Sequence, residues 1–240
     1  MPRDFHAIAV GNHLLDGLPT AEQGRVMASC ELVQLPGGAV IDMPGTPLRY
    51  VYFPSTSAIA SLLPMDGGHM IEVSLTGFEG LYGAAAGRGS GLSSVRAQVH
   101  VPGLAWRMPV ASFRKSLAAR SSLAGMVDRY LTAVIAQLGR AAGCNRFHRV
   151  EQRVARWLLM TADRGRSPTF AMTHELVAAA LGVRRVGVTN AAGHLQRLKL
   201  ISYGRGVVAI VNRKGLELAS CGCYRADLDA YALALGTRRA

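Results

Sequence analysis

The sequence predicts an α+β chain of three parts: an N-terminal antiparallel β-roll (double-stranded β-helix, jelly-roll-like), a long helix, and a C-terminal helical part that contains a β-hairpin. Three observations support this order. Short β-rich runs broken by turn residues fill the first half, one long helical stretch crosses the middle, and short capped helices follow it. We place these parts at residues 1–115, 116–145 and 146–240.

Length and composition limit the classes of protein to which this chain can belong. Half of the 240 residues are apolar, so the chain can bury real cores, but no apolar run approaches the ~18–20 residues that a membrane span needs. The N-terminus lacks the features of a signal peptide. We therefore expect a cytoplasmic protein with no membrane partner. The four cysteines (Cys30, Cys144, Cys221 and Cys223) are too few and too scattered for a disulfide framework.

The positive charge is distributed unevenly. The net charge is +12; residues 1–145 hold 11 basic and 9 acidic residues, whereas residues 146–240 hold 16 basic and 6 acidic ones. Such asymmetry indicates that the C-terminal part meets a polyanion. The alternative is a solvated basic surface without a partner.

The N-terminal part begins with a helix and continues as strands. We expect the first helix within residues 18–32, with Thr20 as its cap and Gln23 at the capping-box position. The β-rich runs are residues 39–45, 50–54, 57–64 and 69–75. Asp66-Gly67-Gly68 is typical of a hairpin turn between the last two runs. This spacing predicts a small antiparallel barrel or roll.

A helix is expected from about residue 112 to residue 144. Its first apolar stripe alternates spacings of four and three, as in a coiled-coil seam: Leu123, Val127, Tyr130, Val134, Gln137 and Ala141. A second stripe lies beside it: Leu131, Ile135, Leu138 and Ala142. Because one stripe suffices to pack a helix on its own domain, the second suggests a partner helix. We therefore expect a homodimer, with these dimerisation residues: Leu123, Val127, Tyr130, Val134, Leu138 and Ala141. A single buried core helix is the alternative.

Helical patterns and caps divide the C-terminal part. One helix places Val150, Val154, Trp157, Leu158 and Thr161 on one side and ends at Gly165. Thr173 is placed to cap a helix over 174–181 that ends at Gly182, and a second short helix follows directly. Residues 200–211 form a hairpin that turns at Gly204-Arg205-Gly206, and Asn212 caps a last helix over 213–220.

Two short helices joined by a tight turn with glycine are typical of a helix-turn-helix. The second helix has an expected inner face of Val188, Ala191, Ala192, Leu195 and Leu198. Its opposite face holds Arg184, Arg185, Thr189, Asn190, Gly193, His194 and Arg197. In this motif the start of the second helix enters the DNA major groove, where Arg bonds guanine, Asn bonds adenine, and Thr contacts a thymine methyl group. The following hairpin is then a wing.

These features predict that the chain binds double-stranded DNA and is not an enzyme, because it shows no catalytic triad, paired carboxylates or metal-ligand spacing. The expected DNA-binding residues are Thr173, Arg184, Arg185, Thr189, Asn190, His194, Arg197 and Arg205. The alternative is a sensor module that responds to a cyclic nucleotide or another small ligand, and whose basic half binds RNA or protein.

Residues 146–225 resemble the winged helix-turn-helix of Crp/Fnr-type bacterial transcription regulators, in the run from Thr173 to Glu217 and the trailing "SCGCY". The order of roll, long helix and this domain is similar as well. The resemblance implies a homodimer joined by the long helix on a palindromic operator, with Arg185 and Asn190 facing bases and RNA polymerase as a candidate partner. Val186 departs from the pattern, because many members carry there a Glu that reads cytosine.

The resemblance extends less well to the effector pocket. Members that bind cyclic AMP carry Gly-Glu and later Arg-Ser to hold the phosphate; here Glu79 lacks that context, and Ser93-Ser94 stand where Arg-Ser would be. An anionic phosphate needs a placed cation. We therefore expect no response to cyclic AMP and leave the effector unknown. The candidate effector residues are Glu79, Arg88 and Arg96.

We expect no cofactor and no metal. Cys30 alone cannot hold an iron–sulfur cluster that needs four thiolates. Cys221-Gly222-Cys223 could bind a soft metal or oxidise, but two thiolates without a second pair make a weak metal site. We interpret this triplet as a surface turn.

Overall fold

The computed structural model describes residues 11–87, 89, 91–117 and 121–236. Two short helices, α1 (His13–Asp16) and α2 (Thr20–Met27), open this part of the chain. The strands that follow are β1 (Glu31–Leu35), β2 (Val40–Asp42), β3 (Tyr50–Pro54), β4 (Ala58–Pro64), β5 (Met70–Thr76), β6 (Arg96–Val101) and β7 (Gly103–Pro109). Two single-turn 3₁₀ helices, η1 (Asp66–Gly68) and η2 (Ala84–Gly87), connect strands.

The strands form the predicted antiparallel roll. One sheet has the order β1-β7-β3 and the other has the order β2-β6-β4-β5, and every pairing is antiparallel. The buried side chains of Phe53, Met108 and Phe113 fill the space inside the roll. The hairpin between β4 and β5 turns at the predicted site, where Gly67 and Gly68 have φ of 73° and 76°, values that glycine adopts without strain.

The first predicted cap is wrong by one residue. Thr20 is the first residue of α2, and Pro19 stands at the N-cap without a side-chain capping bond. The ring of Pro19 holds its φ at −55°, so the chain already turns into the helix one residue earlier. Gln23 does not complete a capping box; its Nε2 donates to the carbonyl of Leu15 at 3.0 Å.

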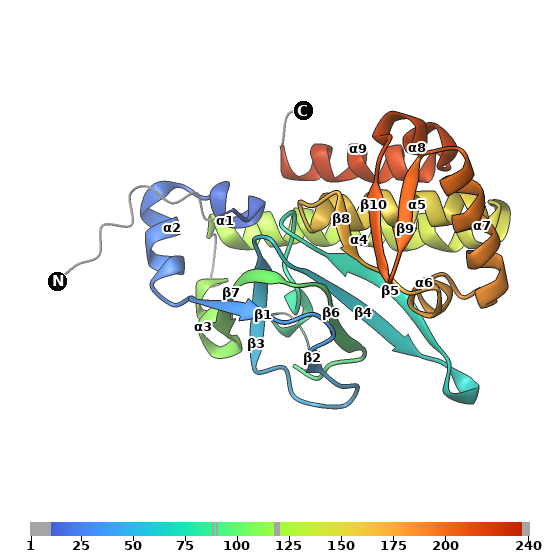
Figure 1. Cartoon of the computed structure of the whole chain (residues 1–240). Coiled ribbons are helices and arrows are strands. Elements are labelled where there is room, and N and C mark those ends of the chain that lie inside the picture. The colour runs from blue at the N-terminus through green and yellow to red at the C-terminus, as the bar shows by residue number, and fades with distance from the viewer. Residues whose placement is uncertain (1–10, 88, 90, 118–120, 237–240) are drawn as a thin grey trace.

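The middle of the chain contains two helices, α3 (Val110–Ser116) and α4 (Ser122–Phe147), where one helix was expected. Ser121 caps α4 by accepting a bond from the Ala124 amide at 3.1 Å. The carboxylate of Glu22 in α2 accepts from the amides of Ser122 and Leu123, so the start of α4 is fixed on the N-terminal helices. In Figure 1, α4 runs across the molecule between the roll and the C-terminal helix α9 (Cys223–Leu235).

The predicted coiled-coil seam is divided between two environments. Leu123, Val127 and Tyr130 are buried in this chain's own core against the roll, so they do not form an exposed dimer seam. Val134 is half-buried and packs on the same core. The second stripe is the exposed one: Ile135 is 69% exposed and Leu138 is 39% exposed. The periodicity of α4 was correct, but the roll covers the side that we assigned to a partner.

The C-terminal part follows the predicted order. Its elements are α5 (Val150–Arg164), β8 (Thr169–Ala171), α6 (His174–Leu181), α7 (Arg185–Arg197), β9 (Ile201–Gly204), β10 (Val207–Ile210), α8 (Arg213–Ala219) and α9. α8 is not the last helix, because α9 folds back along α4, where the rings of Tyr130 and Tyr231 lie 6.1 Å apart. Cys221 is therefore not in a surface turn: it is 3% exposed, and its Sγ lies 3.5 Å from Sγ of Cys144 in α4.

Buried ion pairs join α4, α5, α9 and the roll. Asp227 of α9 is 3% exposed and pairs with both Arg140 of α4 and Arg156 of α5, the latter at 2.5 Å. Arg164 of α5 pairs with Glu79 of the roll at 2.8 Å and donates to Gln137 of α4 at 2.9 Å. Because an unpaired buried charge is costly, each of these carboxylates requires its arginine.

The roll and the C-terminal part also share one apolar core, which we call the shared core. The roll contributes Ala58, Ala60, Leu62, Leu75 and Val101; the C-terminal part contributes residues that include Val154, Leu158, Leu159, Phe170, Val177 and Leu195. A side chain at Gly77 would collide with the backbone of Arg164, with 2.5 Å between its Cβ and the carbonyl oxygen. Glycine at this position therefore permits the close approach of α5 to the roll.

Two titratable side chains lie at the edge of the shared core. Glu72 of β5 lies 3.3 Å from Nδ1 of His100 and accepts a bond from the Trp157 indole at 3.3 Å. Burial raises the pKa of Glu72 to about 7 and lowers the pKa of His100 to about 4. Both side chains are therefore uncharged in the folded protein at slightly acidic pH.

The raised pKa of Glu72 predicts a loss of stability with rising pH. Between pH 4.5 and pH 7 the folded state keeps a proton on Glu72 that the unfolded state releases. The contribution of Glu72 to the unfolding free energy is therefore complete below pH 4.5 and is lost as pH rises through 7. His100 acts in the opposite sense, because its contribution is lost as pH falls from 6.5 through 4. From pH 5 to pH 8 the wild type should lose about 2 kcal/mol of unfolding free energy relative to Glu72→Gln.

Urea denaturation of both proteins at the two pH values measures this difference, and the comparison between the two proteins largely removes the contribution of His100. Equal pH dependence in wild type and Glu72→Gln would show that Glu72 is charged in the folded state.

Candidate nucleic-acid interface

The turn between α6 and α7 is built by local sequence. Thr173 caps α6 as predicted, since its hydroxyl oxygen accepts a bond from the Leu176 amide at 3.1 Å. Gly182 ends the helix in the left-handed conformation, with φ of 61°, and the amide of Val183 then bonds the carbonyl of Ala178 at 3.0 Å. Only three residues, 182–184, separate α6 from α7, so the two helices form a helix-turn-helix.

The inner face of α7 is as predicted except at its end. Val188, Ala191, Ala192 and Leu195 are buried where α7 packs on α5 and α6, and the alanines permit this close packing. Leu198 is 53% exposed and does not belong to the inner face. It is the C-cap of α7, and the chain turns away from the helix axis at that point, so helical periodicity no longer gives its direction.

The outer face carries the predicted DNA-binding residues. The exposed ones on α7 and its cap are Arg184, Arg185, Thr189, Asn190 and Arg197. Thr173 is exposed at the start of α6. His194 differs from these, since it is half-buried and its Nε2 lies 3.3 Å from the carboxylate of Glu151 in α5. The structure therefore brings the predicted set together on one domain, with His194 turned toward α5.

Neighbouring side chains position two residues of this face. The guanidinium of Arg185 pairs with Glu175 of α6 at 2.6 Å, and both side chains are exposed. The Thr189 hydroxyl lies 2.9 Å from Nδ1 of His174, and the His174 ring stacks on Tyr203 of β9 with centroids 4.7 Å apart. An exposed pair contributes at most about 1 kcal/mol, so Arg185 can leave Glu175 for a stronger partner.

Sequence reasoning missed Glu175, His174 and Tyr203 as members of this surface. Glu175 lies two residues beyond the predicted cap, so its place in the first turn of α6 could have been foreseen. The stacking of His174 on Tyr203 joins α6 to the wing, and no local sequence pattern contains that contact.

The first turn of α7 is open to a ligand. Arg184 stands at the N-cap, and no side chain of the described residues caps this end of the helix. The free amides and the positive end of the helix dipole therefore face outward beside Arg184 and Arg185. This arrangement suits a phosphate group.

The wing is a two-residue hairpin. β9 pairs with β10 from Gly204 opposite Val207, and Arg205 and Gly206 form the turn with φ of 52° and 76°. Positive φ at both central residues is the type I′ turn that matches the twist of paired strands. The side chain of Arg205 is exposed at the tip, as predicted. β8 adds a third strand to this sheet next to β10.

The segment that contains these elements matches a family model. Residues 152–219 match the Crp-like helix-turn-helix domain. We call this matched segment the Crp-like domain. Its match begins within α5 and ends with α8, so it includes the two helices, the turn and the wing.

Several solved structures are similar to most of this chain, and not to the Crp-like domain alone. A structure from Eubacterium rectale assigned to the Crp/Fnr family of transcriptional regulators is 17% identical, with a TM-score of 0.65 over 86% of this chain and 96% of that one. A transcriptional regulator of the CRP family from Thermus thermophilus is 18% identical, with a TM-score of 0.65 over 78% of this chain and 96% of that one. The c-di-GMP-responsive global regulator of Xanthomonas campestris is 16% identical, with a TM-score of 0.58 over 80% and 99%.

These likenesses show that the chain shares the fold of solved structures assigned to the CRP and Crp/Fnr families of transcriptional regulators. No sequence among curated proteins matches it. None of the helices in the described ranges has both the length and the apolar character that a membrane span requires.

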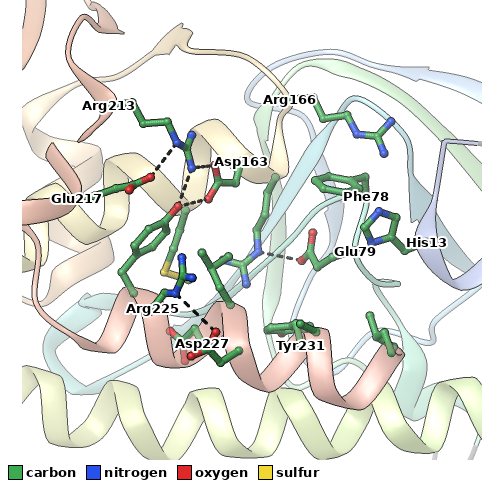
Figure 2. Close-up of a pocket in the computed structure, with 17 residues that line it drawn as sticks. His13, Phe78, Glu79, Asp163, Arg166, Arg213, Glu217, Arg225, Asp227 and Tyr231 are labelled. Atoms are coloured by element: carbon green, nitrogen blue, oxygen red, sulfur yellow. Dashed lines mark hydrogen bonds and ion pairs between the residues drawn. The ribbon is translucent and has the colours of Figure 1, made fainter. Parts of the chain in front are cut away.

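A pocket of about 620 Å³ lies where the roll, the Crp-like domain and α9 meet (Figure 2). Several charged side chains that line the pocket form ion pairs with one another: Asp163 pairs with Arg213 at 2.6 Å, and Glu79 pairs with Arg164. Glu79, one of the candidate effector residues, thus links the roll to α5. Arg96 is half-buried in β6, and Arg88 lies outside the described residues.

Gly182 and Gly193 predict opposite effects of the same substitution on stability. Gly182→Ala should lower the unfolding free energy by about 1–2 kcal/mol, because alanine must adopt the left-handed conformation there and its Cβ lies 3.3 Å from Ile71. Gly193→Ala should raise it by up to about 1 kcal/mol, since this site is inside a helix with open space around it. Urea denaturation measures both values, and equal effects would contradict the structure of this turn.

Proposed function

We propose that this protein is a sequence-specific DNA-binding transcription regulator of the Crp/Fnr type that acts as a homodimer on a palindromic operator. The observation that carries the proposal is the outer face of α7, which is exposed, polar and uncapped at its start, within a Crp-like helix-turn-helix domain. In such domains the start of the second helix enters the major groove.

Two side chains of α7 are proposed to read bases. Arg185 exchanges its exposed pairing with Glu175 for the O6 and N7 acceptors of guanine, and Asn190 bonds adenine through its amide. Val186 is exposed beside them and has no polar group, so it suits contact with a thymine methyl group. The operator is therefore expected to differ at this position from those read by a glutamate.

Other groups are proposed to contact the DNA backbone. The open amides at the start of α7 and the guanidinium of Arg184 suit one phosphate, and Arg205 at the wing tip suits another phosphate or the minor groove. The concentration of positive charge in residues 146–240 supports a large electrostatic contribution to this binding.

The homodimer is proposed to form through the exposed stripe of α4. Ile135 and Leu138 present large apolar side chains to solvent, and the half-buried Leu131 and the exposed Ala142 lie on the same helical face. An apolar stripe on an otherwise packed helix suits a second copy of the same helix. A two-fold dimer would present two α7 helices to half-sites about 34 Å apart.

The roll is proposed not to bind cyclic AMP in the way of the family members that do. Ser93, which stands where those members carry a cation, is buried and donates to the carbonyl of Val95 at 2.7 Å. The carboxyl of Asp42 lies close by, since it interacts with Tyr82, whose hydroxyl is 3.5 Å from that of Ser93. An acidic side chain at this place repels an anionic phosphate.

Arg185→Ala should weaken binding to the selected operator about 10–100-fold and relax the preference for its guanine, because a bidentate contact to a base is lost. The operator is first selected from random duplex DNA, and affinities are then measured by fluorescence anisotropy across a salt series. Arg225→Ala is the matched control, since Arg225 is an exposed arginine on α9, outside the Crp-like domain. Its affinity should equal that of the wild type.

Equal loss in both variants would contradict the assignment of Arg185, and preference for RNA or protein over duplex DNA would favour a sensor module of another kind. Addition of cyclic AMP to the same titrations should leave the affinity unchanged; a gain in affinity would contradict the proposal for the roll.

The double variant Ile135→Asp, Leu138→Asp should be a monomer in analytical ultracentrifugation at concentrations where the wild type is a dimer, because two charges would be buried in the apolar stripe. The control is Leu218→Asp, Leu233→Asp, which changes two exposed leucines on α8 and α9. A dimeric double variant of α4, or a monomeric wild type, would contradict the proposed interface.

A further inference from the structure

Four side chains suited to metal ligation converge where α4 ends and α9 begins. They are Cys144, His148, Cys221 and Cys223, and one donor atom from each lies within 4.8 Å of all the others. Sγ of Cys144 is 3.5 Å from Sγ of Cys221, and Sγ of Cys223 is 3.6 Å from Nδ1 of His148. All three cysteines are free thiols.

The two pairs come from different parts of the chain. Cys144 lies in the last turn of α4, and His148 follows four residues later as the C-cap of that helix, where the chain leaves the helix with its donor atom within 4.8 Å of the Cys144 sulfur. Cys221 precedes α9 and Cys223 is its first residue, separated by the exposed Gly222. The second pair of donors that the Cys-x-Cys triplet lacked in the sequence is supplied by the end of α4.

The distances fit one small ion. Four ligands placed tetrahedrally around Zn²⁺ at about 2.3 Å for sulfur and about 2.0 Å for nitrogen lie roughly 3.5–3.8 Å from one another. Two of the donor separations are already close to this value, and the longest needs a contraction of about 1 Å. A multi-iron cluster would hold its thiolates farther apart than a single ion does.

The surroundings also fit a metal site. Cys144 and Cys221 are buried, and His148 and Cys223 are half-buried, so the donors are largely shielded from solvent. Three thiolates with Zn²⁺ carry one net negative charge. Arg153 and Arg156 of α5, which interact electrostatically with both Cys144 and Cys221, can balance that charge.

We infer that Cys144, His148, Cys221 and Cys223 form a structural zinc site. Three sulfurs and one imidazole nitrogen fill all four positions of a tetrahedral ion, which is the ligand set of a closed structural site rather than of a catalytic one. Thiolate and imidazole donors favour zinc over magnesium or calcium.

The position of the site gives it a mechanical role. The Crp-like domain, residues 152–219, lies between the two ligand pairs in the sequence. The ion therefore ties both ends of this domain to the C-terminal end of α4 and closes a loop of more than 70 residues. The existence of the site does not depend on the proposed DNA-binding function.

The test begins with the full chain purified without an affinity tag and dialysed in reducing buffer. Elemental analysis should find about one zinc per chain in the wild type and in Cys30→Ser, the control that removes the cysteine of the roll. Cys223→Ser and His148→Ala should retain much less. Replacement of zinc by Co²⁺ should give the intense visible absorption of a tetrahedral thiolate site in the wild type and in Cys30→Ser, but not in Cys223→Ser or His148→Ala.

Two further measurements separate a lost ligand from a lost fold. His148→Cys supplies a fourth thiolate and should recover zinc and the Co²⁺ spectrum, whereas circular dichroism checks that His148→Ala is folded. Removal of zinc by a chelator should lower the Tm of the wild type and leave the Tm of folded His148→Ala nearly unchanged.

Several results would overturn the site. The first is a wild-type chain that binds neither zinc nor Co²⁺ under these conditions, and the second is an equal zinc content in Cys30→Ser and Cys223→Ser. The others are iron or copper in place of zinc, and a disulfide between Cys144 and Cys221 that persists in the reducing buffer. Because these readouts involve no DNA, failure of the zinc site is distinguishable from failure of the proposed regulator function.

Discussion

The buried carboxylate of Asp227 is the contact on which the arrangement of the helices depends. It is 3% exposed and pairs with Arg140 of α4 and Arg156 of α5, so α9, α4 and α5 cannot separate without leaving this carboxylate unpaired. α9 is thereby held along α4, and α5 is held beside both. The helix-turn-helix packs on α5, so the ion triad contributes to the placement of α7.

The local elements of the Crp-like domain could be predicted from sequence, because each depends on residues close together in the chain. Thr173 caps α6, Gly182 ends it, and Asn212 caps α8, all through bonds that span at most five residues. The wing followed from the turn sequence Gly204-Arg205-Gly206 between apolar runs. The outer face of α7 then followed from helical periodicity alone, apart from His194, which a carboxylate of α5 turns inward.

Other features depend on contacts between distant segments, and periodicity could not give them. The seam of α4 was identified correctly as apolar, but the pattern does not say whether Leu123 and Val127 meet the roll or a second chain. α9 was missed although Tyr224, Asp227 and Tyr231 have helical spacing; its tilt toward α4 is set by an ion pair across 87 residues. Likewise, Cys144 and Cys221 are adjacent only because α9 returns to the end of α4.

The shared core has a consequence for how any signal could travel through this protein. Leu62 and Val101 of the roll belong to the same buried cluster as Leu158 and Phe170 of the Crp-like domain, so a rotation of that domain away from the roll would expose apolar surface to water. In an allosteric equilibrium between this arrangement and a rotated one, the free energy of that exposure favours the present arrangement. An effector would have to bind the rotated state more tightly by at least the same amount, or a second interface would have to bury the exposed side chains.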